Sequence, residues 1–560
     1  MFVRKKSTPN SPRQSVQIVE SIRDGERVIQ RIVRHVGVAM NEEELEQLIE
    51  LAYHIKAQIE EEHTPTLFGP EKMAKLALDA RKNKQKAKDP INVNLSELRE
   101  EQRVIVGIHE IYGKIFKELG FDQVLKSSRH GQSAANILRH IVMARIANPE
   151  SKRASVINLE ADFGVNLNLQ NVYRMMDKLD EEACEKIQRN AYQTVADLFG
   201  GKIDVIFFDA TTLYFESFTE DELKQNGFSK DHKFGQSQVL LALMVTQQGM
   251  PIGYEVFPGS TYEGHTLIPI LQSVKEKYDL GKVVFVADSG LLNTKNLQAM
   301  DDAGFKYIVG ARLRKMKSDL QKKIHNIDNY TYDEDRDDKL RLASFELESG
   351  NKLFVSHSTK RARKDAHDRE KAIEKLKKKL RKSKNPKELI SNKGNNKFLK
   401  IEGNAEIQLD DEKCVAAAVW DGLHGVITND SELSAERALK QYRGLWQVEE
   451  SFRITKHDLK VRPIYHWTPN RIRAHLAISF MAFTCVRHLE YRVALQHKKL
   501  SPETIRRALI RVQSSILVDT KKQKYAIPSQ VGQDARKIYQ VMGLTYSCTP
   551  YRLNDALITK

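Results

Sequence analysis

Length and charge set the first limits on this chain. Its 560 residues are too many for one compact core, so we expect several domains. Lys and Arg number 90 against 74 Asp and Glu, a formal net charge of +16 that favours a polyanionic partner such as nucleic acid. The four cysteines lie far apart with no Cys-x-x-Cys pair, which argues against a disulfide framework and a structural zinc site.

The sequence offers no segment suited to a membrane. Its longest apolar run, 474–486, is interrupted by His475 and Ser479 and is too short to span a bilayer, so we expect a buried helix there. No apolar stretch near the first residues resembles a signal peptide. Together with the cysteine usage, this predicts a cytoplasmic protein with no membrane partner.

Residues 1–96 are predicted to form a hairpin, a helix and a linker. The turn of the hairpin is Asp24-Gly25, and Asn41 is the expected cap of the helix. The two strands, the acidic helix and the Lys-rich linker are expected at 15–21, 28–34, 41–62 and 81–88.

Residues 97–200 are predicted to be helical and to bind DNA. Apolar residues recur at helical spacing within 104–119, 134–146 and 172–198. Basic side chains are scattered over these segments: Arg139, Lys152, Arg153, Arg174 and Lys178. A helical DNA-binding module and a packing domain with solvated cations both fit this pattern.

Residues 201–312 change to an α/β pattern. Buried apolar runs and amphipathic stretches follow one another in the order β, ββ, α, β, α, β. The strands are expected at 203–209, 238–246, 251–257, 283–288 and 307–311, and the helices at 265–278 and 293–303.

Residues 313–433 interrupt that pattern with a mainly β insertion that contains a basic helix. Strands are expected at 340–347, 352–357, 398–407, 414–420 and 425–428, and the basic helix at 360–384. Residues 434–560 should hold a long helix that begins near Ser434 and bears Glu449, followed by a C-terminal helical region.

Two acids follow buried strands of the α/β pattern. Asp209 and Asp288 each come at the end of an apolar run, where a carboxylate must be solvated, paired or bound to a metal. Taken singly, an Asp in such a place is more often a helix cap or a turn former. Their shared setting favours a joint role.

Glu449 lies in the predicted long helix. Tyr442, Glu449 and Lys456 are seven residues apart, so an unbroken helix would place them on nearly one face, with Arg453 one turn away. An acid flanked by an aromatic residue and cations suits a metal-dependent site that grips a nucleic-acid phosphate. A solvated helix with i,i+4 ion pairs would have the same sequence pattern.

Three acids would suit two-metal phosphoryl transfer. That chemistry needs oxygen ligands around two Mg²⁺ ions roughly 4 Å apart, and it needs no protein nucleophile. The sequence contains no Gly-x-Ser-x-Gly motif and no Walker-type loop, so a serine hydrolase and an NTP-driven enzyme are both disfavoured.

These motifs resemble those of bacterial insertion-sequence transposases of the DDE class, in the group marked by a Tyr-x2-Arg-x3-Glu-x6-Lys signature. The matching residues are Tyr442, Glu449 and Lys456, whereas Leu445 stands where the group has Arg. The resemblance covers most of the chain and is best at 208–212, 286–290, 420–429 and 442–462. It implies an α/β fold: a ribonuclease-H-like catalytic core interrupted by a mainly β insertion, with N-terminal helical and C-terminal helical regions.

The resemblance also implies what the site residues do. Asp209, Asp288 and Glu449 would bind Mg²⁺ or Mn²⁺, two ions together. The residues in contact with DNA would be Tyr442, Arg443, Arg453, Lys456 and Trp420. Metal-activated water would cut the element ends, and the freed 3′-OH would attack target DNA. In some relatives a Trp of the insertion stacks on a flipped base, for which Trp420 and Trp446 are the candidates. A core aromatic residue is the more common explanation for Trp420, and Trp446 fits a core position equally well.

The implied partner is double-stranded DNA, as the terminal inverted repeats of the element and as its target. The protein would act as a homodimer on DNA. It would lie in the cytoplasm of a bacterium, associated with the nucleoid. Two alternatives share this core. One is a catalytically silent or domesticated DNA-binding relative, which Leu445 favours and the three intact acids oppose. The other is a structure-specific nuclease, which would cut DNA without joining it.

Overall fold

The computed structural model of the chain contains two compact units. The first comprises Met1–Asn190, His457–Val461 and Asn470–Lys560, and the second comprises Ala191–Lys456 and Arg462–Pro469. The structure describes residues 1–7, 13–24, 27–63, 70–71, 74–75, 77–78, 93–126, 131–201, 203–216, 218–227, 235–278, 283–291, 293–332, 340–382, 394–402 and 406–553. The linker predicted at 81–88 lies outside these residues.

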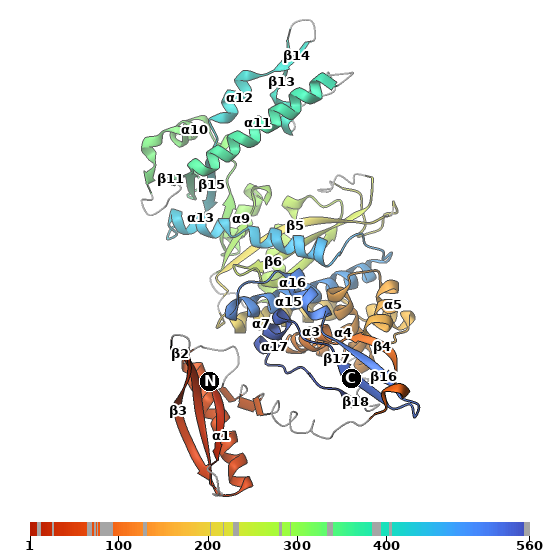
Figure 1. Cartoon of the computed structure of the whole chain (residues 1–560). Coiled ribbons are helices and arrows are strands. Elements are labelled where there is room, and N and C mark those ends of the chain that lie inside the picture. Colours follow the sequence, from red (N-terminus) through yellow and green to blue (C-terminus); the bar gives the residue numbers. More distant parts are fainter. Residues whose placement is uncertain are drawn as a thin grey trace. The chain divides into compact units, whose positions relative to one another are not determined.

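The second unit is built on a large mixed sheet (Figure 1). Its core part has the strands β5 (Val205–Tyr214), β6 (Gln238–Thr246), β7 (Pro251–Pro258), β8 (Val284–Ala287) and β9 (Lys306–Gly310). They lie in the order β7-β6-β5-β8-β9; β5, β6 and β7 are antiparallel neighbours, whereas β8 and β9 run parallel to β5. Helices α8 (Leu267–Lys277) and α9 (Thr294–Asp302) complete the order predicted for 201–312.

Strands of the inserted segment extend this sheet. The additional strands are β10 (Thr331–Tyr332), β11 (Arg341–Glu346), β12 (Lys352–His357) and β15 (Leu423–Thr428). β15 pairs antiparallel with β9, and β12, β11 and β10 follow outward in that order. The predicted hairpin of 340–347 and 352–357 is confirmed, and Gly350 in its turn has the left-handed φ of +79° that favours glycine.

The rest of the insertion corrects the prediction of a mainly β segment. It contains α10 (Ser318–His325), α11 (Thr359–Lys382), the short strands β13 (Leu399–Glu402) and β14 (Glu406–Leu409), and α12 (Asp411–Ala418). α11 confirms the basic helix, but the strand predicted at 414–420 is wrong. The Asp410 carboxylate caps α12 by accepting from Lys413 N at 3.1 Å, and the alanines of α12 favour helix.

The long helix predicted from Ser434 is divided. α13 (Ala435–Arg443) and α14 (Trp446–Arg453) meet at Gly444 and Leu445, and a π-helical turn covers Ile454–Asp458. At the joint the backbone tightens to i→i+3 hydrogen bonds, such as Leu445 N to Tyr442 O at 3.0 Å. α14 packs against β5 and β6.

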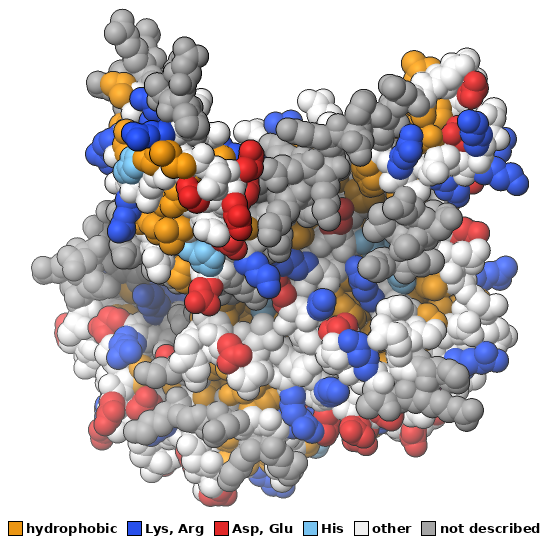
Figure 2. All heavy atoms as spheres, turned by 90° about the horizontal axis from the view of Figure 1, so that it is seen from below, with side chains coloured by type: hydrophobic (Ala, Val, Ile, Leu, Met, Phe, Trp, Pro, Cys, Tyr) orange, Lys and Arg blue, Asp and Glu red, His pale blue; other side chains and the backbone are white. Residues whose placement is uncertain are grey.

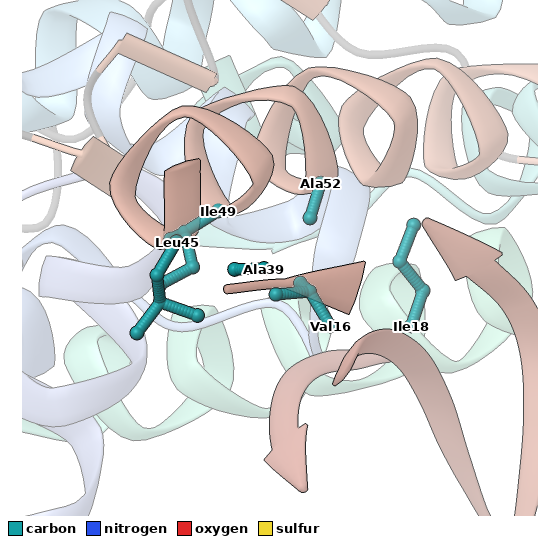
Figure 3. Close-up of a cluster of buried hydrophobic side chains, with 6 residues drawn as sticks. All are labelled: Val16, Ile18, Ala39, Leu45, Ile49 and Ala52. Carbon is teal, nitrogen blue, oxygen red and sulfur yellow. The ribbon is translucent and has the colours of Figure 1, made fainter. Parts of the chain in front are cut away.

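The N-terminal module of the first unit is a three-stranded antiparallel sheet covered by one helix. Its elements are β1 (Phe2–Ser7), β2 (Gln14–Asp24), β3 (Arg27–Ala39) and α1 (Glu42–His63). The predicted hairpin and helix are confirmed, with Asn41 Oδ1 accepting from Glu44 N at 2.8 Å, whereas β1 was not predicted. Leu45, Ile49 and Ala52 of α1 face Val16 and Ile18 of the sheet (Figure 3).

The remainder of the first unit is largely helical, with one small sheet. Its helices are α3 (Gly107–Glu118), α4 (Gly131–Ala147), α5 (Lys152–Phe163), α6 (Leu169–Met176), α15 (Pro469–Gln496), α16 (Pro502–Ile510) and α17 (Gln533–Val541). Helix α7 (Glu181–Leu198) begins in this unit and ends in the second. The sheet has the order β18-β17-β16-β4, with strands Tyr551–Leu553, Lys524–Pro528, Gln513–Val518 and Arg99–Ile105. These strands were not predicted within the two regions expected to be helical.

α15 is the helix that contains the long apolar run, and most of its side chains are buried as predicted. Among the residues that the structure describes, no helix is long and apolar enough to cross a membrane. On the face of the molecule drawn in Figure 2, basic and acidic side chains are interspersed. The excess of basic over acidic residues is therefore not concentrated on this face.

Candidate active site

The sheet brings the two aspartates side by side. β5 and β8 pair in parallel with Phe208 opposite Ala287, so Asp209 and Asp288 come next on neighbouring strands. Adjacent strands lie about 4.8 Å apart. Asp288 follows the last residue of β8 as predicted, but Asp209 is in the middle of β5. The strand continues to Tyr214 because its second half pairs with β6.

Backbone amides hold the two carboxylates. Asp288 Oδ1 accepts from Gly290 N at 2.7 Å, and Asp209 Oδ1 accepts from Ala210 N at 2.8 Å. A Cβ at position 290 would lie 2.9 Å from Asp288 Oδ1, so glycine leaves room for that carboxylate. Both aspartates are half-buried.

Arg312 supports the loop that follows Asp288, and sequence reasoning missed it. Its guanidinium Nη2 donates to Ser289 O, with a longer contact of 3.4 Å to Gly290 O. Arg312 comes just after β9, the strand next to β8. No motif marks it, because its partners are main-chain carbonyls that only the parallel pairing brings near.

Glu449 lies in the first turn of α14, and its side chain is exposed. The joint before α14 comes very close to β5. A Cβ at Gly444 would lie less than 3.0 Å from Phe207 Cζ, and Phe207 is fully buried. Leu445 is 9% exposed, so in this chain the position packs in the core and supplies no cation to DNA.

Tyr442 links the three acids electrostatically. Burial raises the pKa of its phenol to about 12, and the negative charges of Asp288, Glu449 and Asp209 contribute, against an opposing effect of Arg361. The hydroxyl also lies against Gly310, where any Cβ would overlap it. Tyr442 and Glu449 are on different helices, so the tight joint, and not one helical face, brings them to the same region.

Lys456 reaches the strand that carries Asp209. Its Nζ donates to Thr211 Oγ1 at 2.5 Å, and Thr211 lies on the same face of β5 as Asp209, two residues on. Lys456 belongs to the π-helical turn, a local distortion that is frequent at functional sites.

The two predicted arginines differ in their surroundings. Arg453 makes a paired contact with the neighbouring Glu450, with Nε–Oε2 at 2.8 Å and Nη2–Oε1 at 2.9 Å. Arg443 is exposed. Burial lowers the pKa of His424 to about 4, and the charges of Arg361 and Arg443 add to this effect.

Trp420 lines a basic cavity of about 630 Å³ within the second unit. Arg314 lies 5.9 Å from the centre of its ring, and the His325 ring packs edge-on at 4.4 Å. The cavity also contains Ser289, the residue after Asp288. Its charged lining comprises the basic residues Arg312, Arg314, Lys315, Arg361, Arg369 and Lys397 and the acidic residues Asp365, Asp368 and Asp421. Asp421 pairs with Arg369, and Asp365 with Arg361. Trp446, by contrast, is 49% exposed on α14 and lies outside this lining.

The donor chemistry of the three acids fits a hard divalent cation, because carboxylate oxygens are the ligands that Mg²⁺ and Mn²⁺ prefer. Among the described residues, however, no three His, Cys, Asp or Glu side chains are close enough together to enclose an ion. The aspartates lie on neighbouring strands, and Glu449 lies on the helix packed against β5.

Comparisons with known proteins identify the family. A model described as a transposase DDE domain matches residues 200–485, just over half of the chain, and one described as the IS1634 family transposase N-terminal domain matches residues 2–65. A comparison with curated proteins finds no match.

Solved structures with some likeness are themselves transposases. A piggyBac transposase synaptic complex with hairpin DNA is 8% identical, with a TM-score of 0.34, over 72% of this chain and 78% of that one. A Mos1 transposase paired-end complex is 13% identical, with a TM-score of 0.14, over 48% and 77%. These values are too low to bear on the site, so the family rests on the DDE domain match: the chain belongs to the DDE transposases of bacterial insertion sequences, metal-dependent enzymes that cut and join DNA.

Proposed function

We propose that Asp209, Asp288 and Glu449 together hold two divalent ions, Mg²⁺ or Mn²⁺, for cutting element ends and joining them to target DNA. The observation that carries this assignment is the parallel pairing of β5 with β8, which makes Asp209 and Asp288 neighbours, with Glu449 on the helix packed against β5. The strand order β7-β6-β5-β8-β9, with its antiparallel half and its parallel half, supports a ribonuclease-H-like core around them. When bound, the ions would activate water or a 3′-OH and stabilise the leaving oxygen.

In this proposal Glu449 must move toward the aspartates when DNA and metal bind. The three carboxylates would repel one another without cations, which agrees with the open arrangement of the described residues. Gly444 and the π-helical turn flank α14 and offer places where the backbone can adjust.

Tyr442 and Lys456 would position the scissile phosphate. A tyrosine hydroxyl is protonated at neutral pH and can donate to a phosphate oxygen, and the raised pKa of Tyr442 extends this to higher pH. Lys456 would exchange Thr211 Oγ1 for the phosphate, as a point charge beside Asp209. Arg443 would contact the DNA backbone, and Arg453, already paired with Glu450, would contribute less.

Trp420 would take an unpaired base in the cationic cavity. Base–aromatic stacking contributes about 1–3 kcal/mol, and Arg314, Lys315 and Lys397 of the lining would contact the neighbouring phosphates. Residues 97–200 would add further contacts to double-stranded DNA. Exposed Arg153 and Arg174 suit that role, whereas Lys152 is only 3% exposed and does not.

Adjacent glutamates provide the sharpest test. The full-length variants Glu449→Gln and Glu450→Gln carry the same substitution at adjacent positions of α14, and the second is the control. We expect Glu449→Gln, like Asp209→Asn and Asp288→Asn, to lower Mg²⁺-dependent cleavage of an element-end duplex by roughly a hundredfold or more, since even changes behind metal ligands cost about 10- to 100-fold. Glu450→Gln should keep at least a third of the wild-type rate. Equal rates for both glutamate variants would refute the metal role of Glu449.

Joining is measured in the same reaction. Insertion of the cut end into a target plasmid is the product expected of a transposase. Cleavage that never yields joined product would favour the nuclease alternative, and no cleavage by the wild type would favour the silent relative. The mass of the protein–DNA complex, measured with and without the end duplex, tests the proposed homodimer.

A further inference from the structure

The N-terminal module separates its charge between its two layers. Residues 1–40, which include the three strands, contain eight Lys and Arg against three acids. Residues 41–63, which include α1, contain eight Glu against one Lys. The module therefore has a basic sheet and an acidic helix, although its net charge is close to zero.

One face of the sheet is committed to α1. Val3, Val16 and Ile18 pack in the core with Leu45 and Ile49 of the helix. Gly37 allows this close packing, because a Cβ there would lie 2.7 Å from Leu48 Cδ2. Neighbours in a strand point to opposite faces, so Arg4, next to Val3, belongs to the other face.

That other face, here named the free face, is defined by three cross-strand rows. Register places these rows as Phe2–Val19–Ile32, Arg4–Gln17–His35 and Lys6–Ser15–Val38. The middle row is tied together, since Arg4 Nη2 donates to Gln17 Oε1 at 2.7 Å and Nη1 to Gln30 Oε1 at 3.0 Å. Both glutamines therefore share the free face with Arg4.

The free face combines cations, amides and apolar groups without an acid in its rows. On the outer strands Lys6, Gln30 and His35 are exposed, as are Phe2 (38%), Ile32 (50%) and Val38 (48%), whereas Gln17 (8%) and Val19 (0%) of the central strand are buried. Arg and Gln are side chains that read base edges in the major groove, and apolar groups can contact thymine methyls. Lys6 can contact a phosphate.

We propose that the free face of the β1–β2–β3 sheet is a DNA-binding surface that contacts the element end. A β-ribbon or small sheet fits the major groove. The exposed glutamates of α1, on the opposite side of the sheet, would be repelled by DNA and so fix which face approaches it. The proposal rests on the transposase activity but not on the assignment of the three acids.

Charge decides between DNA and a second copy of the chain. If two free faces met, Arg4, Lys6 and His35 of one copy would approach the same residues of the other, with no acid in the rows to compensate. DNA supplies the complementary charge along the whole face.

Full-length protein with matched charge removals tests the proposal. Arg4→Gln/Lys6→Gln removes two cations from the free face. Lys5→Gln/Arg34→Gln removes two from the opposite face, because Lys5 pairs with Val16 and Arg34 with Ile18. If a double variant unfolds, the single variants Lys6→Gln and Lys5→Gln still compare the two faces, because both lysine side chains are exposed. Binding to an end duplex and to a scrambled duplex is measured by fluorescence anisotropy from 0.1 to 0.5 M salt.

We expect the free-face variants to bind the end duplex more weakly and the controls to match wild type. Each lost phosphate contact should reduce the salt slope by about 0.9, which corresponds to about fivefold in affinity at roughly 0.15 M salt relative to 1 M. Loss of Arg4 should also reduce the preference for the end duplex. Equal affinities of free-face and control variants would overturn the proposal. So would a change in oligomeric mass without a change in DNA affinity, which would assign the face to a second copy.

The outcome is separable from that of the metal-site test. A free-face variant should cleave at the wild-type rate once DNA is saturating, whereas Asp209→Asn should bind DNA normally and fail to cleave it.

Discussion

Gly444→Ala is expected to inactivate the enzyme by moving Glu449. The new methyl group would lie 3.0 Å from Gln441 O, 3.1 Å from Phe207 Cε2 and less than that from Phe207 Cζ. Carbon atoms in contact prefer about 3.5–4.0 Å, so the joint between α13 and α14 must retreat from β5 by about 1 Å. Phe207 cannot yield instead, since it is fully buried in the sheet.

The shift has two measurable consequences. Glu449 lies about one turn after the joint, so it moves when the joint moves. A displacement of about 1 Å at a catalytic group costs about 100-fold in rate. Overpacking of this kind also costs about 1–3 kcal/mol in the free energy of unfolding. We would measure single-turnover cleavage of an element-end duplex at saturating Mg²⁺, and unfolding by circular dichroism in urea.

A suppressor and a control make the test specific. Phe207→Leu removes the ring atoms that the methyl group meets, so Phe207→Leu/Gly444→Ala should recover much of the rate lost by Gly444→Ala. Gly532→Ala is the control, because its Cβ would have no atom within 4 Å. Wild-type cleavage by Gly444→Ala, or a loss that Phe207→Leu leaves unchanged, would refute the idea that this close approach positions Glu449.

Four further predictions concern the rest of the site. Arg312→Ala should lower cleavage about 10- to 100-fold, with unchanged DNA affinity, because it releases the Ser289–Gly290 carbonyls behind Asp288; reduced affinity with a normal rate at saturation would contradict this. The folded-state pKa of Tyr442 is raised to about 12, so the contribution of its phenol to stability is complete below about pH 10 and is lost as pH rises toward 12. Above about pH 10 the free energy of unfolding in urea should therefore fall more steeply with pH for wild type than for Tyr442→Phe. Parallel pH dependences for the two proteins would contradict this prediction. Lys456→Gln should weaken cleavage far more than Thr211→Val, since the lysine and not its resting partner would contact the phosphate; the reverse order would make the pair structural. Trp420→Ala should slow cleavage while Trp446→Ala does not, as measured on the same end duplex, and equal effects would remove the cavity from the reaction.

Local sequence was sufficient for most elements of the core. The strands at 238–246 and 251–258 follow the prediction because both are continuous apolar runs bounded by turn residues. The helices around 267–277 and 294–302 follow it because their periodicity and caps are local, as with Asn293 Oδ1, which accepts from Asn296 N.

Prediction failed where another part of the chain decides the outcome. β5 runs past Asp209 because β6 supplies its partner, and the helix of Glu449 breaks because Phe207 of β5 occupies the space at Gly444. The strands β4 and β16 pair although about 400 residues separate them in sequence, so no window of sequence could reveal them. The 414–420 run was misassigned because a short apolar run fits helix and strand equally.

The sequence by itself determined the three acids, their order along the chain and the basic character of a DNA-acting protein, since residue type and local spacing carry that information. Tertiary structure alone decided what stands around them. Parallel pairing of β5 with β8 makes Asp209 and Asp288 neighbours, and the tight α13–α14 joint places Tyr442 and Glu449 on separate helices, with the hydroxyl of Tyr442 against Gly310. Arg312, Phe207 and the free face of the N-terminal sheet act through contacts between residues distant in sequence, and only the folded chain brings such residues together.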